Sequence, residues 1–152
     1  MRYQLVTIGT VKRGFYAEGC AFYLERLKNY SKIQVVELKE HKAAHSETVK
    51  QAESETLLGA ASGYLIVLDE TGKTFTSEKL AQRITTLENQ SISLVSLLIG
   101  GAEGHSETLK KTAKELWSLS SLTLPHELAR LVLLEQLYRA ETIRAGHPYH
   151  RP

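Results

Sequence analysis

The last residues of the chain, AGHPYHRP at 145–152, carry more chemically active groups than a chain terminus usually does. Tyr149 and His150 can move protons, and Arg151 can offset a developing negative charge or hold a phosphate. Two explanations fit these residues. Either the tail is packed down for stability, or its side chains are delivered to a site.

A second stretch with chemical potential is the glycine-rich LLIGGAEGHS at 97–106. It follows an apolar run and precedes a helical pattern, which is where open α/β sheets bind their ligands. Glycines let a ligand approach the backbone, and the start of the next helix offers free N–H groups. The pattern is neither GxGxxG nor GxxxxGK[ST], so it specifies neither a dinucleotide fingerprint nor a phosphate loop. A tight turn between a strand and a helix explains the same glycines.

Hydroxyl residues interrupt an expected strand in the segment LWSLSSLTLPHELAR at 116–130. Buried hydroxyls need hydrogen-bond partners, which either local turns or a bound ligand could supply. Backbone groups of this segment could bind an adenine edge or a ribose. His126 follows directly and is a further candidate for proton transfer.

Other reactive residues give little support for a metal centre or a nucleophile. Cys20 is the single cysteine, and its place in a helical pattern favours a small buried hydrophobe. His41 and His45 in HKAAH lack a third ligand and the glutamate of HExxH. His147 and His150 also lack nearby thiol or carboxylate ligands. We therefore expect no metal site, and the absence of GxSxG argues against a serine hydrolase.

Size and composition predict one globular domain. The 152 residues are 42% hydrophobic and 24% charged, and the net charge of +2 permits an RNA partner without requiring one. Every apolar run is shorter than the roughly 20 residues that span a bilayer. The opening MRYQLVTIGT lacks the features of a secretory signal, so we expect a cytoplasmic protein that makes no use of a membrane.

Apolar runs alternate with segments of helical periodicity, which predicts an α/β fold with a mostly parallel sheet and helices on both faces. The final helix carries four consecutive apolar residues, LVLL at 131–134, so several of its sides must be covered and a second protomer is a reasonable cover. We expect strands at 3–8, 33–38, 64–68, 92–99 and 118–124, and helices at 15–30, 46–61, 77–88, 106–117 and 126–145.

The chain resembles the RlmH family of the SPOUT superfamily of methyltransferases over its whole length. The motifs that carry the resemblance are VTIGT at 6–10, LDETGK at 68–73 and LLIGGAEG at 97–104, together with LTLPH at 122–126, EQLYRA at 135–140 and HPYHR at 147–151. The resemblance implies one domain over 1–152 whose C-terminal part forms a deep trefoil knot. It also implies a homodimer that holds S-adenosylmethionine in the knot and methylates N3 of a pseudouridine in helix 69 of 23S ribosomal RNA, in the assembled ribosome.

The resemblance also assigns the cofactor site by position. Its expected contacts are Leu68 at the end of the third expected strand, Gly100 at the start of the glycine loop, and, in the serine-rich segment, the run Leu119, Ser120, Ser121, Leu122, Thr123 and Leu124.

Methyl transfer to an imide nitrogen requires that its proton leave, so a general base or a charge-stabilising cation is needed. The candidates are Tyr149, His150, Arg151 and His126, and we expect the tail to close over the target base. Candidate RNA contacts are the basic residues Lys12, Arg13, Arg26, Lys28, Lys32, Arg139 and Arg144.

Two other functions stay open at this point. A ribosome-binding module without catalysis would have lost the cofactor loops or the tail, and this chain keeps both. An NAD-dependent oxidoreductase would carry GxGxxG in its first strand-to-helix turn, where this chain has GTVKRG at 9–14.

Overall fold

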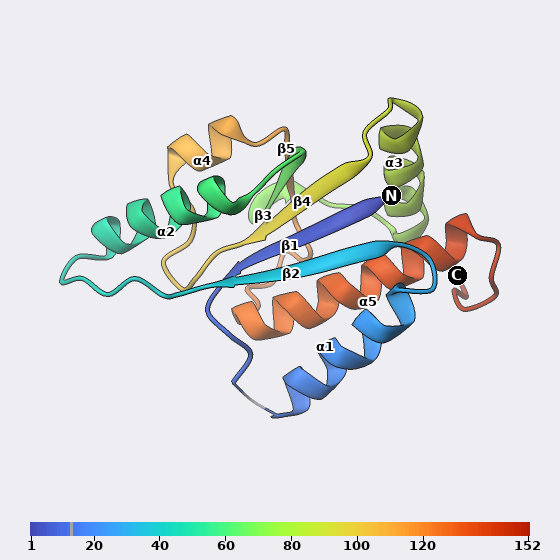
Figure 1. Cartoon of the computed structure of the whole chain (residues 1–152), viewed down its shortest axis with the longest axis horizontal. Helices are drawn as coiled ribbons and strands as arrows, with labels where there is room; N and C mark the ends of the chain where they lie inside the picture. The colour runs from blue at the N-terminus through green and yellow to red at the C-terminus, as the bar shows by residue number, and fades with distance from the viewer. Residues whose placement is uncertain (13) are drawn as a thin grey trace.

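The computed structural model describes residues 1–12 and 14–152. Strands in this part of the chain form one parallel sheet in the order β2-β1-β4-β3-β5 (Figure 1). All strands therefore end at the same edge of the sheet, where the loops that follow them gather. Their bounds are Arg2–Ile8 (β1), Lys32–Leu38 (β2), Tyr64–Lys73 (β3), Leu94–Ile99 (β4) and Glu115–Trp117 (β5).

Helices cover both faces of the sheet, as the sequence predicts. On one face α5 packs between α1 and α3, and on the other α2 contacts α4 (Figure 1). Their bounds are Gly14–Leu27 (α1), Ser46–Ala60 (α2), Ser77–Asn89 (α3), Glu107–Thr112 (α4) and His126–Arg144 (α5).

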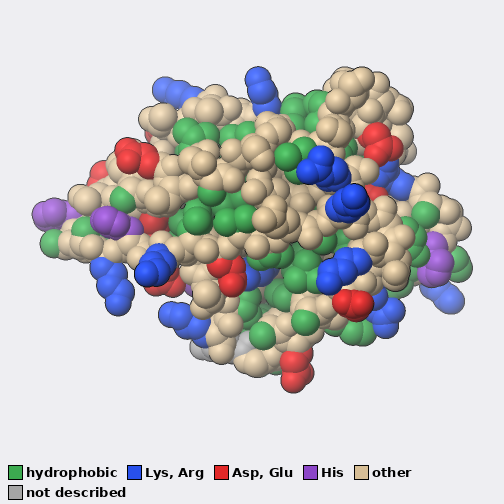
Figure 2. All heavy atoms as spheres, viewed as in Figure 1, with side chains coloured by type: hydrophobic (Ala, Val, Ile, Leu, Met, Phe, Trp, Pro, Cys, Tyr) green, Lys and Arg blue, Asp and Glu red, His purple; other side chains and the backbone are tan. Residues whose placement is uncertain are grey.

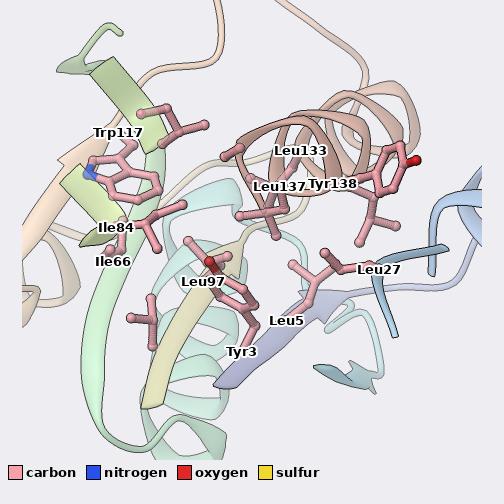
Figure 3. Packing of buried hydrophobic residues seen from close by; sticks show 14 of the residues in the cluster. Tyr3, Leu5, Leu27, Ile66, Ile84, Leu97, Trp117, Leu133, Leu137 and Tyr138 are labelled. Atoms are coloured by element: carbon pink, nitrogen blue, oxygen red, sulfur yellow. The ribbon is translucent and has the colours of Figure 1, made fainter. Parts of the chain in front are cut away.

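The alternating side chains of the strands feed two separate cores, because successive residues of a strand point to opposite faces. Leu5 and Leu97 are fully buried against the α5 face, where Figure 3 shows them beside Leu133 and Leu137. Their neighbours Val6 and Leu98 belong to the core under α2 and α4. Of the four consecutive apolar residues of α5, Leu131, Leu133 and Leu134 thus belong to a core that α1, α3 and the sheet share.

Two expected elements differ from the structure. The helix expected at 106–117 ends at Thr112, and residues 115–117 instead form β5, which pairs with β3. The strand expected at 118–124 is an irregular loop. Its hydroxyls bond within the loop, since the Ser118 hydroxyl donates to the carbonyl of Ser120 at 2.9 Å. Local side-chain bonds of this kind compete with a strand ladder.

Strand β3 runs past its expected end and makes an unusually close contact with β5. Trp117 pairs with both Leu68 and Lys73, so two parts of β3 flank it. At Gly72, a Cβ atom would lie 2.5 Å from the backbone carbon of Leu116. This approach requires a residue without a side chain.

Candidate functional site

A cavity of about 600 Å³ opens where the loops after β3, β4 and β5 converge. This volume lies within the range of small-molecule pockets, and the position is where parallel sheets bind ligands. Of the eight residues that the family resemblance assigns to a cofactor, Ser121 is exposed and does not line the cavity. The other seven do so: Leu68, Gly100, Leu119, Ser120, Leu122, Thr123 and Leu124.

His105 ties two of these loops together, although nothing in the sequence analysis singled it out. Its Nε2 lies 3.0 Å from the carbonyl oxygen of Leu68. A Cβ atom on Gly100 would lie only 2.7 Å from Cε1 of the same ring. The imidazole therefore fills the space between the end of β3 and the glycine loop, and Gly100 must lack a side chain to admit it.

The surroundings of His105 favour its neutral form. Burial lowers the pKa of His105, and this effect outweighs the hydrogen bond to Leu68 and the nearby charge of Asp69. The Leu68 carbonyl can only accept, so Nε2 carries the proton. Among the described residues, Nδ1 has no hydrogen-bond partner. A protonated ring would thus bury an N–H group without an acceptor, which is unfavourable.

We expect this histidine to make folding stability depend on pH. The unfolded chain binds a proton near pH 6.5 and the folded chain binds it only at lower pH, so stability is present above that range and is lost as pH falls. Urea denaturation between pH 7.5 and 5 should show wild type losing up to about 1.4 kcal/mol more per pH unit than His105→Gln. Glutamine keeps a donor for Leu68 but does not titrate. Equal pH dependence in the two proteins would contradict this role.

The serine-rich loop holds its own shape through its hydroxyls. Besides the bond from Ser118, the backbone N–H of Leu122 donates to the Ser120 hydroxyl oxygen at 2.9 Å. The explanation by local turns is therefore correct for these hydroxyls. It does not conflict with ligand binding, because the loop they shape still lines the cavity.

The charges around the cavity are acidic. Asp69, Glu70 and Glu103 line it, and within the described residues no Lys or Arg does so. Burial by itself would raise the pKa of Asp69, but hydrogen bonds from Thr71 and the charge of Lys110 outweigh it and hold this pKa below its ordinary value. Asp69 is thus ionised at neutral pH but pairs with Lys110 at 3.4 Å, so the exposed Glu70 and Glu103 carry most of the negative charge of the lining. Such a lining favours a ligand with positive charge and disfavours a polyphosphate.

Of the four candidates for the general base or the charge-stabilising cation, His126 lies at the cavity. It begins α5 and contributes to the lining. Tyr149 is elsewhere, packed edge-on against Tyr138 with its hydroxyl donating to Glu135 at 2.9 Å. Burial and this hydrogen bond raise the pKa of Tyr149 well above its ordinary value. The phenol therefore stays protonated in this arrangement.

His150 is held in place between α3 and α5. Arg139 can only donate, so Nδ1 of His150 accepts from it at 3.1 Å and Nε2–H donates to Glu78 at 2.8 Å. The lone pair that a general base needs is thus occupied. Arg151 is exposed and does not line the cavity. His126 therefore lines the cavity of its own chain, whereas the tail residues Tyr149, His150 and Arg151 do not.

Comparison with known proteins identifies the family. The family model described as predicted SPOUT methyltransferase matches residues 1–150. The chain belongs to the SPOUT methyltransferase family. Its relatives include proteins named ribosomal RNA large subunit methyltransferase H, from Deinococcus radiodurans at 45% identity and Gloeobacter violaceus at 40%, each over 99% of both chains. The relative of that name from Thermus thermophilus is 41% identical over the full length of both chains.

Family membership makes the chain a methyltransferase and confirms the resemblance drawn from the motifs. Within the described residues of this SPOUT chain, no helix is long and apolar enough to cross a membrane. The same residues contain no cluster of three His, Cys, Asp or Glu side chains that could hold a metal ion. Cys20 is buried, as its helical position suggested.

The basic residues expected to meet RNA are scattered over this SPOUT domain. Arg139 pairs with Glu135, and Arg144 pairs with Glu88. Lys32 begins β2 at the amino edge of the sheet, opposite the cavity. Arg13 lies outside the described residues. Composition alone therefore did not identify a common basic surface.

Proposed function

We propose that the chain transfers a methyl group from S-adenosylmethionine to N3 of a pseudouridine in helix 69 of 23S ribosomal RNA, in assembled ribosomes. The observation that carries the proposal is the cavity of a SPOUT methyltransferase lined by carboxylates and by no described Lys or Arg. The relatives named as ribosomal RNA methyltransferases support the RNA substrate. An enzyme with this substrate works where ribosomes are, which in a bacterial cell is the cytoplasm.

The size and charge of the lining support the proposed cofactor. We propose that backbone groups at Leu68 and Gly100 and in the serine-rich loop bind its adenosine, while the carboxylates of Asp69, Glu70 and Glu103 attract its positively charged sulfonium. When bound, S-adenosylmethionine supplies a methyl group on a sulfonium that is already strongly electrophilic. The protein then has to align the acceptor nitrogen and remove its proton. His126 is the residue at the cavity that we propose for this proton.

The tail needs a second copy of the chain to reach a cavity. Tyr149 is held by Glu135, which lies nine residues after His126, or about 13 Å along α5. We propose a homodimer in which α5 packs antiparallel to its equivalent, so the tail of one protomer meets the cavity of the other. The exposed Phe22 on α1, beside α5, is consistent with such an interface. Arg151 would then offset the negative charge on the target base.

Mixing two inactive variants tests this arrangement. Arg151→Ala should lower kcat about a hundredfold or more while S-adenosylmethionine still binds, and Gly100→Ala should lose the cofactor. If the tail acts on the partner's cavity, a refolded mixture should recover about a quarter of wild-type activity, because half of the dimers are mixed and each has one intact site. No recovery in mixed dimers would show that the tail serves its own chain.

Calorimetry separates the other functions. The purified protein should bind S-adenosylmethionine and not NAD, since the phosphates of NAD would meet carboxylates at the cavity. Binding of NAD alone would favour the oxidoreductase, and binding of neither would favour a module without catalysis.

We also propose that the C-terminal part is knotted. Two observations support it: Trp117 is flanked by two parts of β3, and the backbones meet closely at Gly72.

A further inference from the structure

The loop between β2 and α2, residues 39–45 with the sequence KEHKAAH, begins at the same edge of the sheet as the cofactor cavity. In the sheet, Leu38 is paired with Ile8, and Thr7 with Ile99. The loops that follow β1, β2 and β4 therefore begin next to one another at the carboxyl edge. The N–H of Gly9 donates to the carbonyl of Leu38 at 2.7 Å, which joins the first two of them.

This loop is basic and exposed. Lys39, His41, Lys42 and His45 are all exposed, and Lys39 and Lys42 make no ion pair among the described residues. The loop's one carboxylate, Glu40, faces Lys12 of the neighbouring loop at 3.9 Å. Figure 2 shows histidines together with Lys or Arg side chains at the narrow end of the molecule, where Figure 1 places this loop.

A buried carboxylate lies between the loop and the glycine-rich segment of the cavity. Glu53 of α2 is 3% exposed, and one of its oxygens accepts from the backbone N–H of His41 at 2.9 Å. Its other oxygen lies 2.8 Å from where a Cβ of Gly101 would be. Glu53 is thus hydrogen-bonded to the 39–45 loop and lies in close contact with the glycine loop.

The two surfaces suit different parts of one polyanion. Carboxylates at the cavity repel phosphate, so an RNA whose base enters the cavity must rest its backbone outside. Lys and Arg side chains without ion-pair partners are well suited to bind the phosphate backbone. Enzymes that modify a base extrude that single base from its stack. We propose that the 39–45 loop binds the phosphate backbone of the RNA substrate and so holds the target base over the cavity. This inference rests on the proposed RNA substrate.

Four other lysines lie away from the 39–45 loop. Lys28 and Lys32 lie at the amino edge of the sheet, and β2 itself puts about 20 Å between Lys32 and the start of the 39–45 loop. Lys111 and Lys114, which are exposed and make no ion pair among the described residues, lie at the far end of α4 near the amino end of β5. They provide a control with the same change of charge.

The experiment compares the double variant Lys39→Ala with Lys42→Ala against the double variant Lys111→Ala with Lys114→Ala. Methyl transfer to ribosomes that lack the modification should show a KM for ribosomes raised about tenfold or more by the first variant, with kcat and the Kd for S-adenosylmethionine unchanged. The slope of log affinity against log salt should fall by about two, one for each lost phosphate contact. The second variant should match wild type.

A direct measurement of RNA binding tests the role of the 39–45 loop independently of methyl transfer. Fluorescence anisotropy of a labelled RNA hairpin should show weaker binding by the first variant alone. Equal binding by both variants, or equal weakening, overturns the role of the 39–45 loop. Wild-type protein that binds the hairpin but methylates no ribosome contradicts the proposed function instead.

Discussion

Gly100→Ala should raise the Kd for S-adenosylmethionine about a hundredfold while leaving the protein folded, which corresponds to about 2.7 kcal/mol of binding energy. The added Cβ would lie 2.7 Å from Cε1 and 3.0 Å from Nδ1 of the His105 ring. That ring is buried and is held by the Leu68 carbonyl, so it cannot yield without moving the end of β3. Both loops would then leave the positions that line the cavity. Calorimetry with S-adenosylmethionine measures the loss.

A second substitution shows whether this clash is the cause. Removing the ring in the double variant Gly100→Ala with His105→Ala should restore part of the lost affinity, because the two residues are in contact and their effects do not add. Gly59→Ala is the matched control, since a Cβ at Gly59 has no atom within 4 Å. It should bind as wild type does. Wild-type affinity in Gly100→Ala would contradict this account of the cavity.

Gly72→Ala should destabilise the whole fold by about 3 kcal/mol, at the upper end for an overpacked site. Its Cβ would lie 2.5 Å from the carbon and 2.6 Å from the oxygen of the Leu116 carbonyl group. A backbone group cannot rotate away as a side chain can, so β3 and β5 must separate and lose their pairing at Trp117.

Urea denaturation with Gly59→Ala as a control checks this prediction. Gly59 lies within helix α2 in open space, so alanine there should stabilise the protein by about 0.5–1 kcal/mol. A Gly72→Ala variant as stable as wild type would show that β3 and β5 do not need their close contact. The proposed knot would then lose one of its two supports.

The sequence predicts most of the fold, because strong periodicity gives the strands β1 to β4 and the helices on both faces. It does not predict β5. Residues 115–117 continue the pattern of α4, and three residues become a strand only because β3 offers them partners. The sequence also predicts a strand where the serine-rich loop lies. Hydrogen bonds such as the one from Ser118 to Ser120 depend on the local backbone geometry, which the sequence pattern does not reveal.

The cavity was predictable in outline, because the carboxyl ends of parallel strands meet at one edge. His105 was not, since a lone histidine has no spacing that marks it and its role depends on the Leu68 carbonyl. The position of the tail could not be predicted without the structure: the contacts of Tyr149 with Glu135 and of His150 with Arg139 show that the tail turns back along α5. The RNA-binding candidates among the basic residues could not be chosen from the sequence. Strand register places Lys39 and Lys42 at the carboxyl edge of the sheet, and ion pairs show that Arg139 and Arg144 already have partners.

Transfer of a labelled methyl group from S-adenosylmethionine to ribosomes tests the central claim most directly. Wild-type protein should place one methyl group on N3 of a pseudouridine in helix 69, with intact ribosomes methylated better than isolated large subunits. Gly100→Ala should transfer far less when the cofactor concentration is near the wild-type Kd. A wild-type protein that binds S-adenosylmethionine but leaves ribosomal RNA unlabelled, or that labels a different nucleotide, would contradict the account.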